Sequence, residues 1–133
     1  MTFEEFCVKA ISLPVPFKTR GRDWSGWDCW GLIVVAYREV YGIEIATYTE
    51  RYRSIKQKDL IASVYNEGKK DGWYEVDEAQ EGDVVIVYMD GRDMHSGLAI
   101  DKNEMIHAEN NINTVVEKIS NYRLEGIYRR NGK

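Results

Sequence analysis

The stretch "GWDCWGLIVVAYREVYG", residues 26–42, predicts the buried helix around which the rest of the chain must pack. Its middle, "WGLIVVAY", is apolar all round, which is typical of a helix that is covered on most sides. We expect this helix to begin near Asp28 or Cys29, to run to about Tyr41 and to end at Gly42, because glycine readily adopts the left-handed conformation that ends helices.

Two further helical segments are predicted on either side of this stretch. "FEEFCVKAI", residues 3–11, has Thr2 as a plausible N-cap and is ended by the prolines of "SLPVP". Its apolar face is expected to hold Phe3, Phe6, Cys7, Ala10 and Ile11. Cys7 is therefore expected to be a small buried hydrophobe. A weaker helical pattern, "KQKDLIASVYNEG", covers residues 56–68.

From residue 73 onward the hydrophobic period becomes that of strands. "GDVVIVYM", residues 82–89, is apolar on both faces and predicts a central strand. Short strands with hairpin-like connections follow, in "HSGLAID" (95–101), "EMIHAE" (104–109), "TVVEKI" (114–119) and "LEGIYRR" (124–130). Helices first and a mostly antiparallel sheet second predict an α+β fold, with residues 1–133 as a single domain.

The composition narrows the classes of function. A chain of 133 residues with 44% hydrophobic composition can bury a real core. Its net charge of -4 gives no electrostatic footprint for nucleic acid, and no apolar segment approaches the length that crosses a bilayer. The N-terminal stretch does not resemble a secretory signal, so we expect the protein to be cytoplasmic when made, with its two cysteines as thiols rather than a disulfide.

Cys29 is the candidate nucleophile, because it stands in the first turn of the predicted buried helix. Unpaired backbone N–H groups and the positive end of the helix dipole favour a thiolate there. Such surroundings lower the pKa of a thiol from about 8.5 into the range of roughly 3.5 to 7.5. The alternative is a packed core thiol, since buried cysteines are common.

The chain has two histidines, His95 and His107, both in the strand half. Alternation along the strand puts the small residues Gly97 and Ala99 on the same face as His95, so the Cys29 helix is expected to approach that face. If the two histidine strands form a hairpin, residues 98 and 106 lie opposite one another and the histidines occupy neighbouring strand positions. Thiol hydrolases need this combination of cysteine, histidine and a third polar group. The alternative for each histidine alone is a core or surface residue whose ring nitrogens are hydrogen-bonded and which has no role in catalysis.

A zinc site is the less favoured interpretation of cysteine and histidine in one domain. The spacings between residues 29, 95 and 107 match no zinc finger or ribbon pattern, although Asp or Glu side chains could still complete a site. "GRDWSG", residues 21–26, lacks the lysine and the strand-to-helix context of a phosphate-binding loop.

Three motifs carry a resemblance to a known family. "DCWGL" (28–32), "MHSGLAID" (94–101) and "MIHA" (105–108) resemble the motif blocks of the NlpC-type cysteine peptidases, papain-like cell-wall hydrolases of bacteria and phages. The resemblance covers most of the chain from about residue 14 onward. It implies a papain-like α+β fold, with N-terminal helices and the nucleophile helix packed on a mostly antiparallel sheet of five to six strands.

The resemblance also implies roles for individual residues. Cys29 would be the nucleophile, His95 the general base and His107 the orienting group, with no metal or organic cofactor. The implied substrates are peptidoglycan stem peptides, cut at D-glutamyl residues, often between γ-D-Glu and diaminopimelate. The residues predicted to contact the substrate are Asp28, Trp24, Trp27 and Ser96, although packing against the core suits the two tryptophans equally well.

The sequence departs from the family pattern at two positions. Trp30 replaces the usual serine after the nucleophile, and "GRDWSGWDCWGL" is closer to the versions found in phage tail proteins. Phe17 stands where the family has a tyrosine, and it lacks the hydroxyl. We therefore expect a phage or prophage tail component that is carried to the cell wall and has other tail proteins as partners. Two alternatives remain: a non-enzymatic tail-assembly subunit that retains the fold, and an amidase with the same fold.

Overall fold

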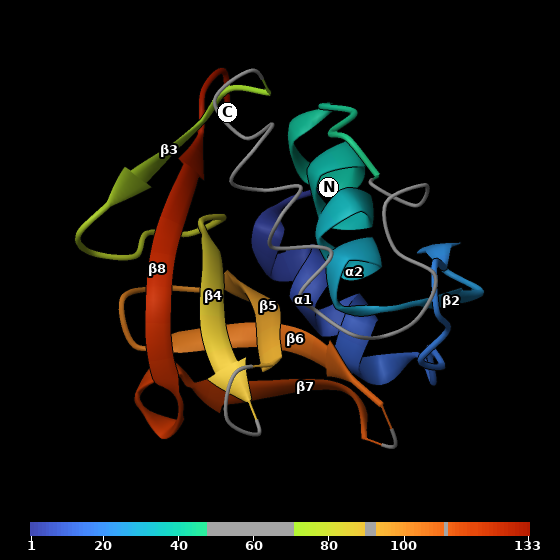
Figure 1. Ribbon diagram of the computed structural model, residues 1–133. Coiled ribbons are helices and arrows are strands. Elements are labelled where there is room, and N and C mark those ends of the chain that lie inside the picture. The colour runs from blue at the N-terminus through green and yellow to red at the C-terminus, as the bar shows by residue number, and fades with distance from the viewer. Residues whose placement is uncertain (48–70, 90–92, 111) are drawn as a thin grey trace.

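The computed structural model describes residues 1–47, 71–89, 93–110 and 112–133. The helix predicted over residues 56–68 lies outside the described residues. The described elements form an α+β fold in which both helices lie on the same side of a sheet (Figure 1). In chain order they are α1 (Phe3–Ser12), β1 (Arg22–Asp23), β2 (Gly26–Trp27), α2 (Cys29–Ala36), β3 (Trp73–Val76), β4 (Val84–Met89), β5 (Asp93–Ala99), β6 (Glu104–Glu109), β7 (Asn113–Lys118) and β8 (Arg123–Arg130).

Helix α1 begins with the predicted capping box. The Thr2 side chain accepts a hydrogen bond from the Glu5 backbone N–H, and the Glu5 carboxylate accepts one from the Thr2 backbone N–H. The apolar face is narrower than predicted, because Ile11 is 47% exposed and Cys7 is only partly buried. The contact with the core is made by Phe3, Phe6 and Ala10.

Helix α2 is buried at every residue, as its apolar sequence predicts. The Asp28 side chain caps its first turn by accepting a hydrogen bond from the Gly31 backbone N–H. A π-helical turn, Tyr37–Tyr41, extends it, and Gly42 ends it with a left-handed φ of 67°. The predicted start and end are confirmed, whereas the change to π-helical geometry has no signal in the hydrophobic pattern.

The main sheet has six strands in the order β3-β8-β4-β5-β6-β7, and all its neighbours are antiparallel. Strand β4 is central, between β8 and β5, as its doubly apolar sequence predicts. In the β5–β6 hairpin Leu98 pairs with Ile106, which confirms the expected register. The edge strand β3 and the small β1–β2 hairpin were not predicted, because each is short and only weakly patterned.

The expectation about the face that α2 covers is wrong. Helix α2 packs in the cluster that contains Leu98 and Ile106, whereas Ala99 belongs to a second cluster with Met105. A Cβ atom added to Gly97 would lie 2.6 Å from the Met105 sulfur, so Gly97 makes room for Met105 rather than for the helix. Both faces of β5 are buried, and alternation alone does not say which face meets α2.

No helix among the described residues combines the length and apolar character needed to span a membrane.

Candidate active site

Cys29 is the first residue of α2 and is 3% exposed. Complete burial of the sulfur and the neighbouring Asp28 carboxylate raise the pKa of the thiol to about 11, against opposing interactions with Ser96 and Arg22. The predicted lowering of this pKa is therefore wrong, because burial of the thiolate and the Asp28 charge outweigh the interactions that favour ionisation. The resting thiol is protonated at neutral pH.

Ser96 lies on strand β5 and contacts the start of helix α2. Its hydroxyl and backbone N–H interact with the Cys29 sulfur and stabilise its ionised form. The Ser96 side chain is fully buried, and its hydroxyl makes no hydrogen bond of ordinary geometry within the described part of the chain. Because Ser96 directly follows His95, the thiol lies beside the strand that carries the predicted base.

The two histidines are bonded to each other. Nε2 of His95 lies 2.8 Å from Nδ1 of His107, and both side chains are buried. On the far side, Nε2 of His107 lies 2.8 Å from the Glu117 carboxylate. The structure therefore brings His95 and His107 together as predicted, and adds Glu117, which the sequence analysis missed.

The hydrogen-bond pattern assigns the protons of both rings. A carboxylate only accepts, so Nε2 of His107 carries a proton and donates it to Glu117. In the neutral form of this ring Nδ1 is then the acceptor, and Nε2 of His95 donates to it. This arrangement leaves Nδ1 as the nitrogen of the His95 ring that carries no proton and can accept one.

Burial, followed by the neighbouring His107, lowers the pKa of His95 to about 3, although the Glu117 carboxylate acts in the opposite direction. His95 is consequently neutral at physiological pH. A protonated thiol and a neutral imidazole form a pair in which the base removes the proton as the sulfur attacks.

The burial of His95 predicts an acid-sensitive fold. The ordinary pKa of 6.5 applies in the unfolded chain, while the folded pKa is about 3, so below pH 6.5 the unfolded state binds more protons. As the pH decreases below 6.5, the free energy of unfolding should decrease by up to about 1.4 kcal/mol per pH unit. Melting temperatures measured from about pH 7 to pH 5 should decline more steeply for the wild type than for His95→Gln. Equal slopes would show that His95 takes up its proton equally in both states.

The Asp28 carboxylate makes its hydrogen bonds to groups within the protein. It is 2% exposed, and its carboxylate accepts hydrogen bonds from the backbone N–H groups of Gly31 and Arg20 and from the Arg22 guanidinium, each at 2.8 Å. These bonds fix the start of α2 and hence the position of Cys29. The predicted contact between Asp28 and substrate stays a prediction.

The two tryptophans before the cysteine differ in their surroundings. Trp27 is fully buried, and its indole N–H donates to the Thr114 hydroxyl at 2.9 Å. It belongs to the core, so the idea that Trp27 lines an open substrate groove is wrong. Trp24 is partly exposed, packs with tilted rings against Trp27 and Phe6, and has the Lys9 ammonium over its ring. A substrate contact through Trp24 stays a prediction.

The two positions that depart from the family pattern have structural roles. Trp30 is buried, as predicted, and its indole N–H donates to the Ala46 carbonyl at 2.8 Å. Phe17 forms an isolated bridge with Trp27, and its backbone N–H donates to the Asn113 side chain at 3.2 Å.

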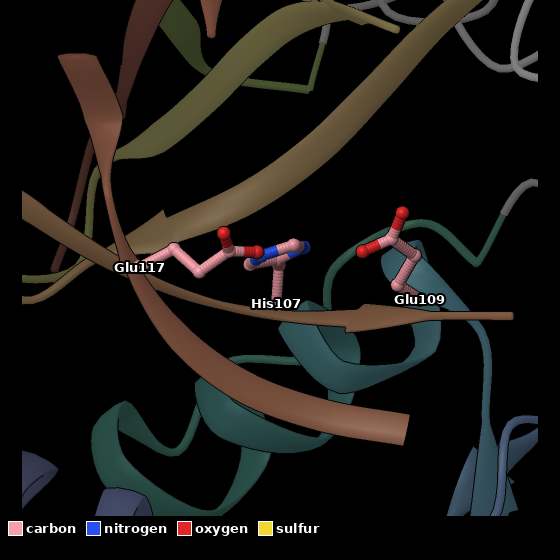
Figure 2. Close-up of side chains that lie close together, drawn as sticks. All are labelled: His107, Glu109 and Glu117. Carbon is pink, nitrogen blue, oxygen red and sulfur yellow. The ribbon is translucent and has the colours of Figure 1, made fainter. Parts of the chain in front are cut away.

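His107, Glu109 and Glu117 are close enough to be considered as a metal site, with one possible ligand atom from each lying within 4.8 Å of the others. Figure 2 shows the Glu117 carboxylate directed at the imidazole and Glu109 on the other side of the ring. A metal on Nε2 of His107 would displace the proton now donated to Glu117, whose carboxylate also accepts from Tyr122. The cluster therefore fits a hydrogen-bonded relay better than a metal site.

The position of Glu117 follows from strand pairing. In the β6–β7 ladder His107 pairs with Val115 and Met105 pairs with Glu117, so Glu117 is a diagonal neighbour of His107 on the same face. The sequence predicted both strands but not their mutual register. That register is the signal that would have revealed Glu117.

The sequence and the fold were compared with protein families and with solved structures. A model of the NlpC/P60 family matches residues 14–130. Among solved structures, the NlpC/p60 domain of the peptidoglycan hydrolase SagA has a TM-score of 0.66 at 19% identity, over 96% of this chain and 96% of that one. No curated protein sequence matches significantly.

Two longer proteins also share the fold. A Staphylococcus aureus protein described as similar to a lipoprotein of the NLP/P60 family has a TM-score of 0.62 at 20% identity, over 97% of this chain and 40% of that one. A Bacillus cereus NlpC/P60 family protein has a TM-score of 0.63 at 19% identity, over 98% and 40%. The present chain thus spans less than half of these two proteins. The likeness confirms the predicted α+β fold with its mostly antiparallel sheet.

Proposed function

The chain belongs to the NlpC/P60 family, and on that basis we propose that it is a cysteine peptidase that hydrolyses peptidoglycan stem peptides. The observation that carries the proposal is the position of Cys29, at the start of a buried helix and against the residue that follows His95. The neutral His95 and its bond to His107 supply the base that a protonated thiol requires. The description of a similar solved domain as a peptidoglycan hydrolase supports the choice of substrate.

The proposed reaction has two stages. Nδ1 of His95 takes the proton of the Cys29 thiol as the sulfur attacks the carbonyl carbon, and backbone N–H groups near Cys29 stabilise the oxyanion. The C–N bond then breaks, the proton on His95 passes to the leaving amine, and a thioester remains on Cys29. In the second stage water gives a proton to His95 and attacks the thioester, which releases the carboxylic acid and restores the thiol.

The proposal extends to the bond that is cut and to the setting. The motif resemblance favours D-glutamyl bonds, such as the one between γ-D-Glu and diaminopimelate. The sequence around Cys29, with Trp30 in place of serine, favours a phage or prophage tail protein that is made in the cytoplasm and carried to the cell wall with other tail proteins. An amidase would use the same residues on a different bond.

Digestion of purified muropeptides tests the proposal. Stem peptides with diaminopimelate or lysine at the third position, with and without the sugar, are incubated with the protein, and the products are identified by mass spectrometry. We expect one new pair of products, separated at the D-glutamyl residue. Cleavage between the sugar and the stem would assign an amidase instead. No product from any stem would favour the tail-assembly subunit.

A further inference from the structure

The hydrogen-bonded pair of His95 and His107 continues beyond the second histidine. The Glu117 carboxylate on β7 accepts hydrogen bonds from Nε2 of His107 at 2.8 Å and from the Tyr122 hydroxyl at 2.7 Å. We propose that Glu117 is a positioning residue of the active site, which holds His107, and through it His95, in the tautomer that accepts the Cys29 proton. This inference rests on the proposed function and assigns a fourth residue to the site.

The effect of Glu117 on His95 follows from which ring nitrogen of each histidine carries the proton. With an acceptor at Nε2 of His107, that nitrogen holds the proton and Nδ1 accepts from His95. Without the acceptor, the other tautomer of His107 becomes accessible, and its Nδ1–H would donate to Nε2 of His95. The proton of His95 would then sit on Nδ1, the nitrogen that accepts the thiol proton in the proposed reaction.

Charge adds to this effect. When His95 takes the thiol proton, a positive charge appears in a buried pair of rings, which is costly without a counter-charge. The Glu117 carboxylate raises the pKa of His95, opposing burial and His107. Hydrogen bonds from Tyr122 and His107 in turn lower the pKa of Glu117, so the carboxylate stays ionised.

The groups around Glu117 support an orienting role. Tyr122 and Asn121, between β7 and β8, hydrogen-bond to it, and the Tyr122 ring meets the His107 ring edge-on with centroids 5.9 Å apart. Glu109 is the other carboxylate near His107, yet it makes no hydrogen bond to either histidine in the part of the chain that the structure describes. Glu109 therefore provides a matched control.

The experiment exploits the fact that the chain has two histidines, so that ¹⁵N-histidine labelling yields four ring nitrogens to assign by NMR. In the wild type both rings should carry their proton on Nε2. Glu117→Leu, which has no acceptor, should move a measurable fraction of both protons to Nδ1. Glu117→Gln, which keeps an acceptor oxygen, should preserve the tautomers, and Glu109→Gln should change nothing.

Kinetics on the cleaved muropeptide provide the second readout. Glu117→Leu should lose roughly 10- to 100-fold in kcat, the range found for outer partners of metal-bound histidines. KM should stay nearly unchanged, because Glu117 is proposed to act through His107 rather than on the substrate. Wild-type tautomers other than those assigned, or a Glu117→Leu variant with unchanged tautomers and kcat, would overturn the inference. Since the NMR measurement needs no substrate, it judges the relay even if no peptidase activity is found.

Discussion

Cys29→Ser is expected to lose hydrolysis of stem peptides by roughly a thousandfold or more, the scale of loss when a nucleophile is removed from a serine or cysteine hydrolase site. A serine hydroxyl is a far weaker acid than the thiol, and the neutral, buried His95 is a weak base, so proton transfer would fail. The fold should survive, because the change replaces one sulfur atom within an otherwise intact helix start. Rates are compared by the appearance of the D-glutamyl product, and the fold by circular dichroism and melting temperature.

The matched control for this variant is Cys7→Ser. Cys7 lies on α1, is partly buried, and has its pKa raised to about 11 by burial and then Glu81. Its thiol lies outside the relay formed by His95, His107 and Glu117, so its removal should leave kcat within about twofold of the wild type. Full activity in Cys29→Ser, or loss of activity in Cys7→Ser with the fold intact, would move the nucleophile away from Cys29.

Asp28→Ala is expected to lower the free energy of unfolding by roughly 3–5 kcal/mol, the cost of removing one partner from a buried ion pair. The Asp28 side chain is 3% exposed and that of Arg22 is 12% exposed, so the guanidinium would lose its carboxylate partner in a poorly hydrated place. The N-cap of α2 would be lost as well, for about 1 kcal/mol. Urea unfolding followed by circular dichroism measures the change.

The amide variant Asp28→Asn separates the two contributions. It keeps an oxygen for the Gly31 N–H and removes the charge opposite Arg22, so its loss of stability should be smaller than that of Asp28→Ala. A stability within about 0.5 kcal/mol of the wild type for Asp28→Ala, typical of surface substitutions, would contradict the structural role assigned here. Asp28 would then be retained for contact with substrate alone.

The features that the sequence predicted correctly are those with local signals. The apolar run after Cys29 and the glycine at position 42 determine where helix α2 and its π-helical extension start and end. The short connection between β5 and β6 determines their register, and Leu98 therefore pairs with Ile106 as expected. The closeness of His95 and His107 follows from that register.

The features that the sequence did not predict depend on the assembled core. Helix α2 covers the Leu98 face of β5 rather than the Ala99 face, and alternation does not encode this choice because both faces are buried. The raised pKa of Cys29 comes first from burial and then from the Asp28 carboxylate, and the extent of burial is not visible in the sequence. Glu117 reaches His107 only through the register of β6 and β7.

The most direct measurement uses a stem peptide whose scissile D-glutamyl carbonyl is built as a chloromethyl ketone, which alkylates a nucleophile held against that carbonyl. The labelled protein is digested, and the modified residue is identified by mass spectrometry. We predict a single adduct on Cys29, prevented by an excess of intact stem peptide and absent from Cys29→Ser. An adduct on Cys7, or none on Cys29 while the same preparation still cleaves stem peptides, would contradict the assignment.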